Sequence, residues 1–187
     1  MGRVHEFATI LGAARRLRHE AGVRFLLIGD GRWRAWIEDE VRRDGLDAVM
    51  LKPYQPRESL AMSLGAGDVH LVSLQPSMEG LVVPSKVYGI AAAGRPLVYI
   101  GDPDGEIAGI VARHGLGLTI EPGDADGLVA ALLELKQNPE ERSAMGARAR
   151  ALFEAQYDKP IALSKWEIVL HEAAGIGKRH RCAGRSY

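Results

Sequence analysis

The sequence predicts an α/β protein built on a doubly wound, Rossmann-like parallel sheet. Short continuous apolar runs, such as Phe25 to Ile28 and Leu97 to Ile100, have the length and character of strands buried on both faces. Longer segments of helical character lie between these runs, which is the order of parallel βαβ units. Glycine-rich and polar segments follow the runs, at the place where such sheets bind ligands.

The first half of the chain alternates helices and strands. Apolar residues recur at helical spacing from His5 to Glu20, which predicts a first helix. Pro56 is a suitable first residue of a later helix, because its missing N–H costs nothing there. The elements expected after the first helix are a strand at 25–28, a helix at 33–43, a strand at 48–51, a helix at 56–64 and a strand at 69–74.

The second half continues the same alternation. A loop at 75–84 leads into a small-residue helix, which Gly94-Arg95-Pro96 ends with a glycine and a proline. The later elements are a strand at 97–100, a helix at 105–114, a strand at 117–120 and helices at 124–136, 139–156 and 160–174. The aromatic residues Trp33, Trp36 and Trp166 lie in helices and are expected to pack.

Composition excludes several classes of protein. The 187 residues carry 24 Lys and Arg against 24 Asp and Glu, so bulk charge indicates neither nucleic acid nor a membrane as partner. Cys182 is the one cysteine and allows no internal disulfide, which fits a cytoplasmic location. No apolar run reaches the roughly 20 residues that a membrane span needs. We expect one domain over 1–174 and a basic, unstructured tail over 175–187.

The polar chemistry gathers in the stretch from Glu79 to Pro96. An acid and a glycine precede Pro84, Ser85 and Lys86, and a helix follows. A helix N-terminus attracts anions through its free N–H groups, and Ser85 is expected to cap it. Lys86 adds a positive charge where the helix dipole does not favour one, so its position needs a functional reason. The stretch predicts a phosphate site.

This stretch, together with Gly29-Asp30-Gly31 and the opening Gly2 to Phe7, resembles a known family. The chain is similar to the C-terminal, donor-binding half of a retaining, family-four-like GT-B glycosyltransferase of bacterial polysaccharide synthesis. The resemblance covers Met1 to about His171 and implies a nucleotide-diphosphate sugar, UDP- or GDP-linked, as the substrate. It also implies a cytoplasmic location at the inner face of the membrane, with peripheral membrane association of the full-length protein.

The resemblance implies a role for each motif residue. Arg3 and Lys86 would face the donor diphosphate and, with Glu79 beside the sugar, form the catalytic set. The donor-binding residues that it implies are Gly2, Gly29, Gly31, Lys52, Tyr54, Gly80, Leu81, Pro84, Ser85 and Gly89. Among these, Lys52 and Tyr54 would line the base and Gly89 would face the ribose. His5 and His70 are interpreted as structural residues.

Two departures from the family pattern limit how far the family's residue roles can be assigned to this chain. Many members carry a glutamate seven residues before the closing proline, and here Gly89 stands at that place before Pro96. The family's Gly-Arg loop also follows a first strand and a whole acceptor domain, whereas Gly2 and Arg3 open this chain. We therefore expect a sheet that lacks its first strand, and a donor-binding half that is inactive without the N-terminal acceptor domain.

Three functions stay open at this level. The first is a transferase that stabilises its diphosphate leaving group with Lys86 and Arg3 and uses no metal or cofactor. Asp102-Pro103-Asp104 has the spacing of a metal-binding Asp-X-Asp motif but reads as a turn. The second function is an epimerase-like GT-B domain, which would need an acid/base set that is not apparent. The third is a non-enzymatic module that binds a nucleotide sugar or a protein.

Overall fold

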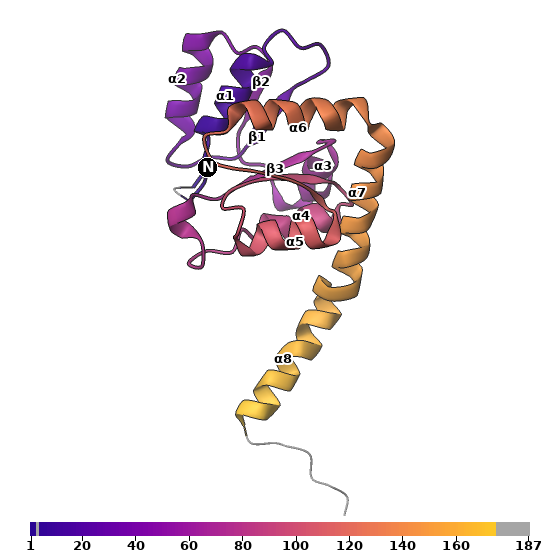
Figure 1. The fold of residues 1–187 in the computed structure, drawn as a ribbon. Coiled ribbons are helices and arrows are strands. Elements are labelled where there is room, and N and C mark those ends of the chain that lie inside the picture. The colour runs from indigo at the N-terminus through magenta and orange to yellow at the C-terminus, as the bar shows by residue number, and fades with distance from the viewer. Residues whose placement is uncertain (3, 175–187) are drawn as a thin grey trace, which may run out of the picture.

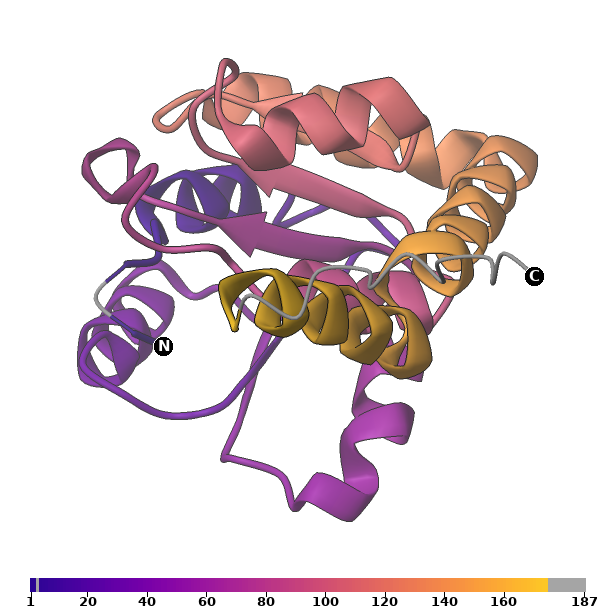
Figure 2. The same ribbon diagram turned by 90° about the horizontal axis from the view of Figure 1, so that it is seen from below.

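The computed structural model describes residues 1–2 and 4–174. Arg3 and the predicted tail at 175–187 lie outside the described residues. Within the described part, helices and strands alternate from α1 (Ala8–Arg16) to α8 (Lys159–Ala173), with helices on both sides of the strands (Figures 1 and 2). The predicted α/β class is confirmed.

The strands form two parallel sheets. In the first, β1 (Phe25–Ile28) pairs with β2 (Val49–Lys52). In the second, β4 (Leu97–Ile100) lies between β3 (His70–Ser73) and β5 (Gly117–Ile120). Among the described residues no strand joins β1 to β3. The break in the sheet falls where the expected first strand of a doubly wound order would lie.

The helices keep the predicted order with shorter bounds. Those before the central motif are α1 (Ala8–Arg16), α2 (Arg34–Asp44) and α3 (Leu60–Gly65), with the 3-10 turn η1 (Arg57–Ser59) before α3. Those after it are α4 (Lys86–Ala92), α5 (Glu106–His114), α6 (Ala125–Gln137), α7 (Pro139–Leu152) and α8 (Lys159–Ala173). Further short turns are η2 (Pro76–Met78), in the loop before α4, and η3 (Phe153–Tyr157), a π-helical turn that continues α7.

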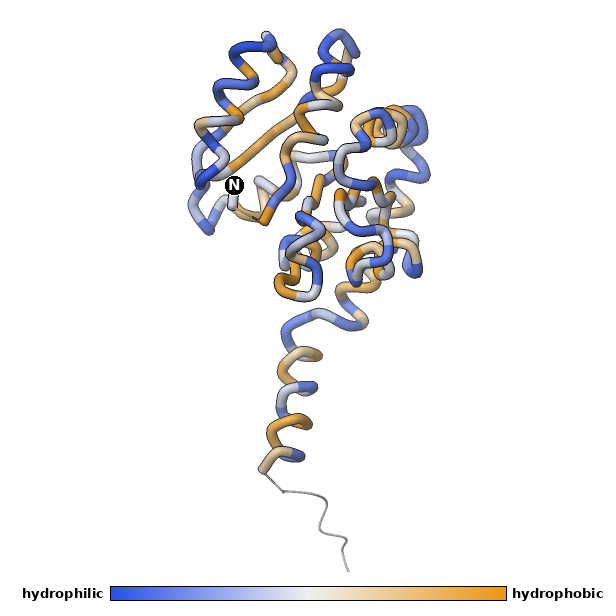
Figure 3. Tube along the Cα trace, turned by 60° about the vertical axis from the view of Figure 1, so that its left-hand side comes forward, coloured by the Kyte–Doolittle hydropathy of each residue, from blue (hydrophilic) through white to orange (hydrophobic). Residues whose placement is uncertain are grey.

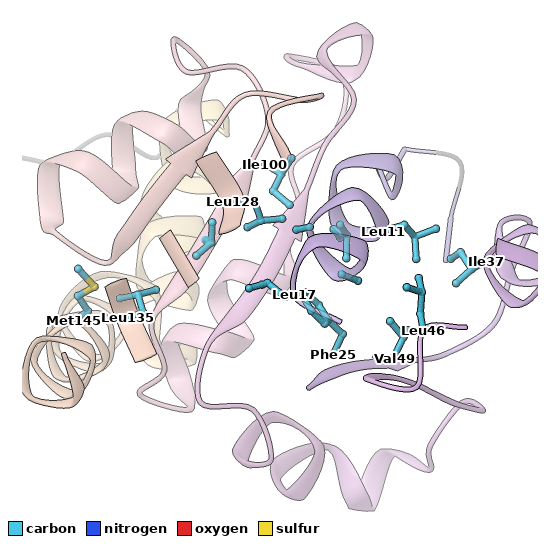
Figure 4. Packing of buried hydrophobic residues seen from close by; sticks show 14 residues of the cluster. Leu11, Leu17, Phe25, Ile37, Leu46, Val49, Ile100, Leu128, Leu135 and Met145 are labelled. Carbon is cyan, nitrogen blue, oxygen red and sulfur yellow. The ribbon is translucent and has the colours of Figure 1, made fainter. Parts of the chain in front are cut away.

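Two hydrophobic clusters cover the two faces of β4. Val98 and Ile100 pack with α1 and α6, whereas Leu97 and Tyr99 pack with α4 and α5. The first cluster continues through α1 to β1 and β2, so α1 connects the two sheets (Figure 4). Burial on both faces, predicted for every strand, therefore holds for β4, whose four residues are all fully buried.

The prediction of two buried faces is wrong for β1 and β2. Leu26, Ile28 and Met50 are 37%, 37% and 40% exposed. The reason is that α1 and α2 cover one face of this sheet, while α3 is short and lies away from β1 and β2, with Met62 76% exposed (Figure 2). The sheet β1–β2 is a half-covered layer.

The helix α8 extends away from the body of the molecule (Figure 1). Apolar residues lie on several sides of it, as its hydropathy shows (Figure 3). Leu163, Trp166 and Leu170 are 53%, 64% and 58% exposed, so the prediction that Trp166 packs is wrong. Trp36 is also exposed, whereas Trp33 packs partly against the core. In the described part of the chain, no helix is both long and apolar enough to cross a bilayer.

Candidate functional site

The segment that opens the chain is fixed between the two sheets. The Trp33 N–H donates to the Met1 carbonyl at 3.4 Å, beside the end of β1. The Gln75 N–H donates to the Val4 carbonyl at 2.8 Å, just after β3. The carboxyl ends of β1 and β3 therefore meet through this segment, and the polar residues of both sheets lie along one edge.

Lys86 lies at this edge, at the start of α4. Its ammonium donates to Nε2 of His5 at 2.9 Å. Desolvation by the surrounding atoms lowers the pKa of Lys86 although the side chain reaches the surface. Among the described residues no carboxylate lies within ion-pair distance of Lys86. The edge thus presents a cation without a protein counter-ion.

The helix start itself differs from the prediction. Ser85 occupies the N-cap position, as expected, but its side chain makes no capping hydrogen bond and its backbone is already helical. The helix α4 has seven residues, so its contribution to anion binding is smaller than that of a long, capped helix. Pro84 is buried and Leu81 is 77% exposed.

Glu79 has an anchoring role that the sequence did not reveal. Its Oε2 accepts from the Tyr99 hydroxyl at 3.2 Å, and its Oε1 accepts from the Glu106 N–H at 3.0 Å, at the first turn of α5. A side chain at Gly105 would meet the Glu79 carboxyl carbon at 2.7 Å. Burial, and then the Glu79 charge, raise the pKa of Tyr99. Glu79 ties the loop after β3 to β4 and α5.

The glycine loop after β1 approaches the opening segment closely. A side chain at Gly31 would meet the Met1 carbonyl oxygen at 2.8 Å, and Gly31 has a φ of 130°. Gly29 is buried, and its N–H donates to the Lys52 carbonyl at 3.1 Å. Arg34, which sequence reasoning missed, donates from Nη1 to the carbonyls of Gly29 and Lys52 at 2.8 and 2.9 Å. This clamp fixes the ends of β1 and β2 together.

Among the described residues, no hydrogen bond joins the remaining predicted residues to the side chains of Lys86 or Glu79. Tyr54 is 78% exposed, and Gly2 and Gly80 are exposed as well. A side chain at Gly89 would meet Leu64 Cδ1 at 3.6 Å, an ordinary contact, so packing does not require a glycine there. Two grooves, of about 410 and 510 Å³, include neither Lys86 nor Glu79 among their lining residues, and the larger one lies beside the end of β5, at Ile120 and Glu121. The candidate site is an open edge rather than a closed cavity.

The described residues contain no group of three or more His, Cys, Asp and Glu arranged to hold a metal ion. In doubly wound α/β domains, ligands bind outside the carboxyl ends of the strands, which is where Lys86 lies.

Comparison with known proteins identifies the family. The family model described as "Glycosyl transferases group 1" matches residues 1–138, so the chain belongs to the group 1 glycosyl transferases. It is 31% identical over 170 residues to a protein of Pseudomonas aeruginosa named "Probable glycosyltransferase WbjE", covering 89% of this chain and 41% of that protein. It is 26% identical over 171 residues to the amylovoran biosynthesis glycosyltransferase AmsK of Erwinia amylovora, covering 87% and 40%.

Solved structures agree on the fold. Sucrose-phosphate synthase from Thermosynechococcus elongatus superposes with a TM-score of 0.75 at 23% identity, over 92% of this chain and 43% of that one. HepE of Anabaena, solved with UDP-glucose, gives 0.70 at 16% identity, over 89% and 44%. The chain thus has the fold of one Rossmann-like half of a GT-B glycosyltransferase and spans about two fifths of its curated relatives.

Proposed function

We propose that this chain is the part of a glycosyltransferase that binds the nucleotide-diphosphate sugar, and that Lys86 contacts the diphosphate. The observation that carries this proposal is the Lys86 ammonium, which lies at the carboxyl edge of the strands with a histidine nitrogen as its partner. A cation whose pKa is lowered by desolvation gains from an anionic ligand, because the ligand replaces the lost hydration.

The proposal fits the chemistry of sugar transfer. The glycosidic bond to the diphosphate breaks as negative charge grows on the leaving phosphate, and a fixed cation there stabilises that charge. HepE was solved with UDP-glucose, which supports a nucleotide sugar as the ligand class. AmsK is named for the synthesis of the polysaccharide amylovoran, which supports a polysaccharide or lipid-linked acceptor. Transfer itself would need an acceptor domain, and no metal takes part.

Lys86→Ala tests this role. The variant should weaken binding of UDP or GDP by about 1.5–3 kcal/mol, the value of a charge-assisted hydrogen bond, or about 10- to 150-fold. Binding of uridine or guanosine should change little. Isothermal titration calorimetry gives both affinities, and Lys159→Ala on α8 is the matched control. Equal losses for nucleotide and nucleoside would contradict the phosphate role, and chelator-sensitive binding would contradict the metal-free proposal.

A further inference from the structure

The hydrogen bonds of His5 fix its tautomer. Its Nδ1 lies 2.8 Å from the Ser73 carbonyl oxygen, which can only accept, so Nδ1 carries the proton. Its Nε2 lies 2.9 Å from the Lys86 ammonium, which can only donate, so Nε2 carries the lone pair. His5 is therefore neutral in this arrangement and accepts the hydrogen bond of Lys86.

The imidazole is held more firmly than the lysine. Ser73 is 5% exposed, and its Oγ accepts from the Glu6 N–H at 3.1 Å. Two residues further on, the Gln75 N–H donates to the Val4 carbonyl at 2.8 Å. The backbone on both sides of His5 is thus bound to the end of β3. Lys86 has a flexible side chain and can move, whereas the ring stays at the edge.

The charges that act on His5 are positive. Burial lowers the pKa of His5, and Lys86 and the amino group of Met1 lower it further, while the Ser73 hydrogen bond acts in the opposite direction. The carboxylate of Glu6, its chain neighbour, instead accepts from the Thr9 N–H at 3.1 Å. Phe7 packs edge-on to the ring at 6.1 Å and brings no charge. Among the described residues, no negative charge contacts the His5–Lys86 pair. A diphosphate bound at Lys86 would supply one.

We propose that His5 takes up a proton from solvent when a nucleotide diphosphate binds at Lys86, and so changes from acceptor of the lysine's hydrogen bond into a second donor to the phosphate. This inference rests on the function proposed above. The 2.9 Å between Nε2 and Nζ lets one phosphate oxygen, or two on the same group, contact both nitrogens. The pair of His5 and Lys86 would then meet the diphosphate with two cations, whereas in the free protein Lys86 is the one cation of the pair.

Proton uptake can be counted directly. UDP-glucose and GDP-mannose are suitable probes, because their diphosphates are diesters that do not titrate near neutral pH. Calorimetry at pH 7.5 in two buffers with different ionisation enthalpies gives the protons bound per ligand. The unaltered chain should take up a measurable fraction of one proton. Its affinity should rise as pH falls from about 8 toward 6.5, by at most about tenfold per pH unit.

Variants separate this role from a structural one. Neither His5→Asn nor His5→Gln titrates, but Asn can still donate to Ser73 and Gln can still accept from Lys86. Both should abolish proton uptake and flatten the pH dependence of affinity. His70→Gln is the matched control, because His70 is also half-buried with its Nε2 on a backbone carbonyl, that of Leu64, at 2.8 Å. It should leave proton uptake unchanged.

The outcomes distinguish the two proposals. Binding of a probe without proton uptake would overturn the role of His5 and leave the proposed function standing. Proton uptake that persists in both His5 variants would also overturn the role of His5 and leave the proposed function standing. Absence of binding by both probes would overturn the proposed function, and the coupling with it.

Discussion

At the scale of single residues, the part-buried pair Glu79 and Tyr99 is the most informative contact. A tyrosine in the middle of an apolar strand needs a partner for its hydroxyl, and Glu79 supplies it at 3.2 Å. Tyr99→Phe should cost about 0.5–1.5 kcal/mol of unfolding free energy. In a double-mutant cycle with Glu79→Ala, the two costs should not add, since each substitution removes the hydrogen bond between the two side chains. Urea denaturation measures them, and additive costs would show that the pair is not coupled.

His5 and His70 predict how stability depends on pH. Burial is the main cause that lowers the pKa of both below the ordinary value of 6.5. Between the folded and unfolded pKa values the unfolded chain binds more protons, so the unfolding free energy falls as pH drops below about 6.5. It levels off once pH is below the folded values. Denaturation curves from pH 8 to 5 should show this loss, reduced in His5→Gln and in His70→Gln. An unchanged slope in both variants would assign the loss to other groups.

The candidate site could be predicted only in part from single residues. The position of Lys86 at a helix start was readable, because that charge opposes the helix dipole. The contact between Lys86 and His5 could not be predicted, because the two residues lie far apart in the sequence. Only the folded chain, in which His5 is bound to the Ser73 carbonyl, brings them together. Arg34 was missed for the same reason, since its clamp joins the ends of two strands. Tyr99 did carry a readable signal, a polar group inside an apolar run.

At the scale of elements, two glycines in helices differ in whether a side chain would fit at their position. A side chain at Gly109 in α5 would meet nothing within 4 Å, whereas one at Gly146 in α7 would meet the Gly94 carbonyl oxygen at 2.3 Å. Gly109→Ala should therefore stabilise the protein by about 0.4–1 kcal/mol, through helix propensity and the entropy of the unfolded chain. Gly146→Ala should destabilise it by about 1–3 kcal/mol, because backbone must move. The shift in urea midpoint measures both, and equal effects would contradict the packing.

Elements with clear local signals were predicted best. The strand Leu97–Ile100 and the helix ending at His114 match the structure, because an apolar run and a following glycine mark them. The first helix, predicted from His5, begins at Ala8 instead. The reason is tertiary: His5 and Glu6 bond to Ser73 rather than continue the helix. The split of 139–156 into α7 and a π-helical turn had no signal in the periodicity.

At the scale of the whole molecule, the divided sheet is the main feature. The sequence predicted the alternation of strands and helices, and the family resemblance implied a sheet without its first strand. It did not predict the exposed face of β1 and β2, since an apolar run looks the same whether one or two faces are covered. That coverage depends on where α3 lies, which periodicity does not determine.

The divided sheet predicts a pattern of amide exchange. At the two ends of β1, the Phe25 N–H donates to the Ala48 carbonyl and the Gly29 N–H donates to the Lys52 carbonyl, both on the side of β2. The N–H groups of Leu26 and Ile28 therefore point to the side without a paired strand. In β4, both sides are paired and all four residues are buried. Hydrogen exchange followed by NMR should therefore be roughly 100-fold or more faster at Leu26 and Ile28 than along β4.

The alternation within β1 is the internal control for this measurement. Phe25 shares a strand with Leu26, so faster exchange at Leu26 than at Phe25 cannot come from fraying of the whole strand, which would expose both amides alike. Slow exchange at Leu26 and Ile28 would mean that another segment or a second chain covers the edge of β1, because an uncovered strand edge leaves its N–H groups to water. The comparison thus tests whether the two sheets are separate in solution.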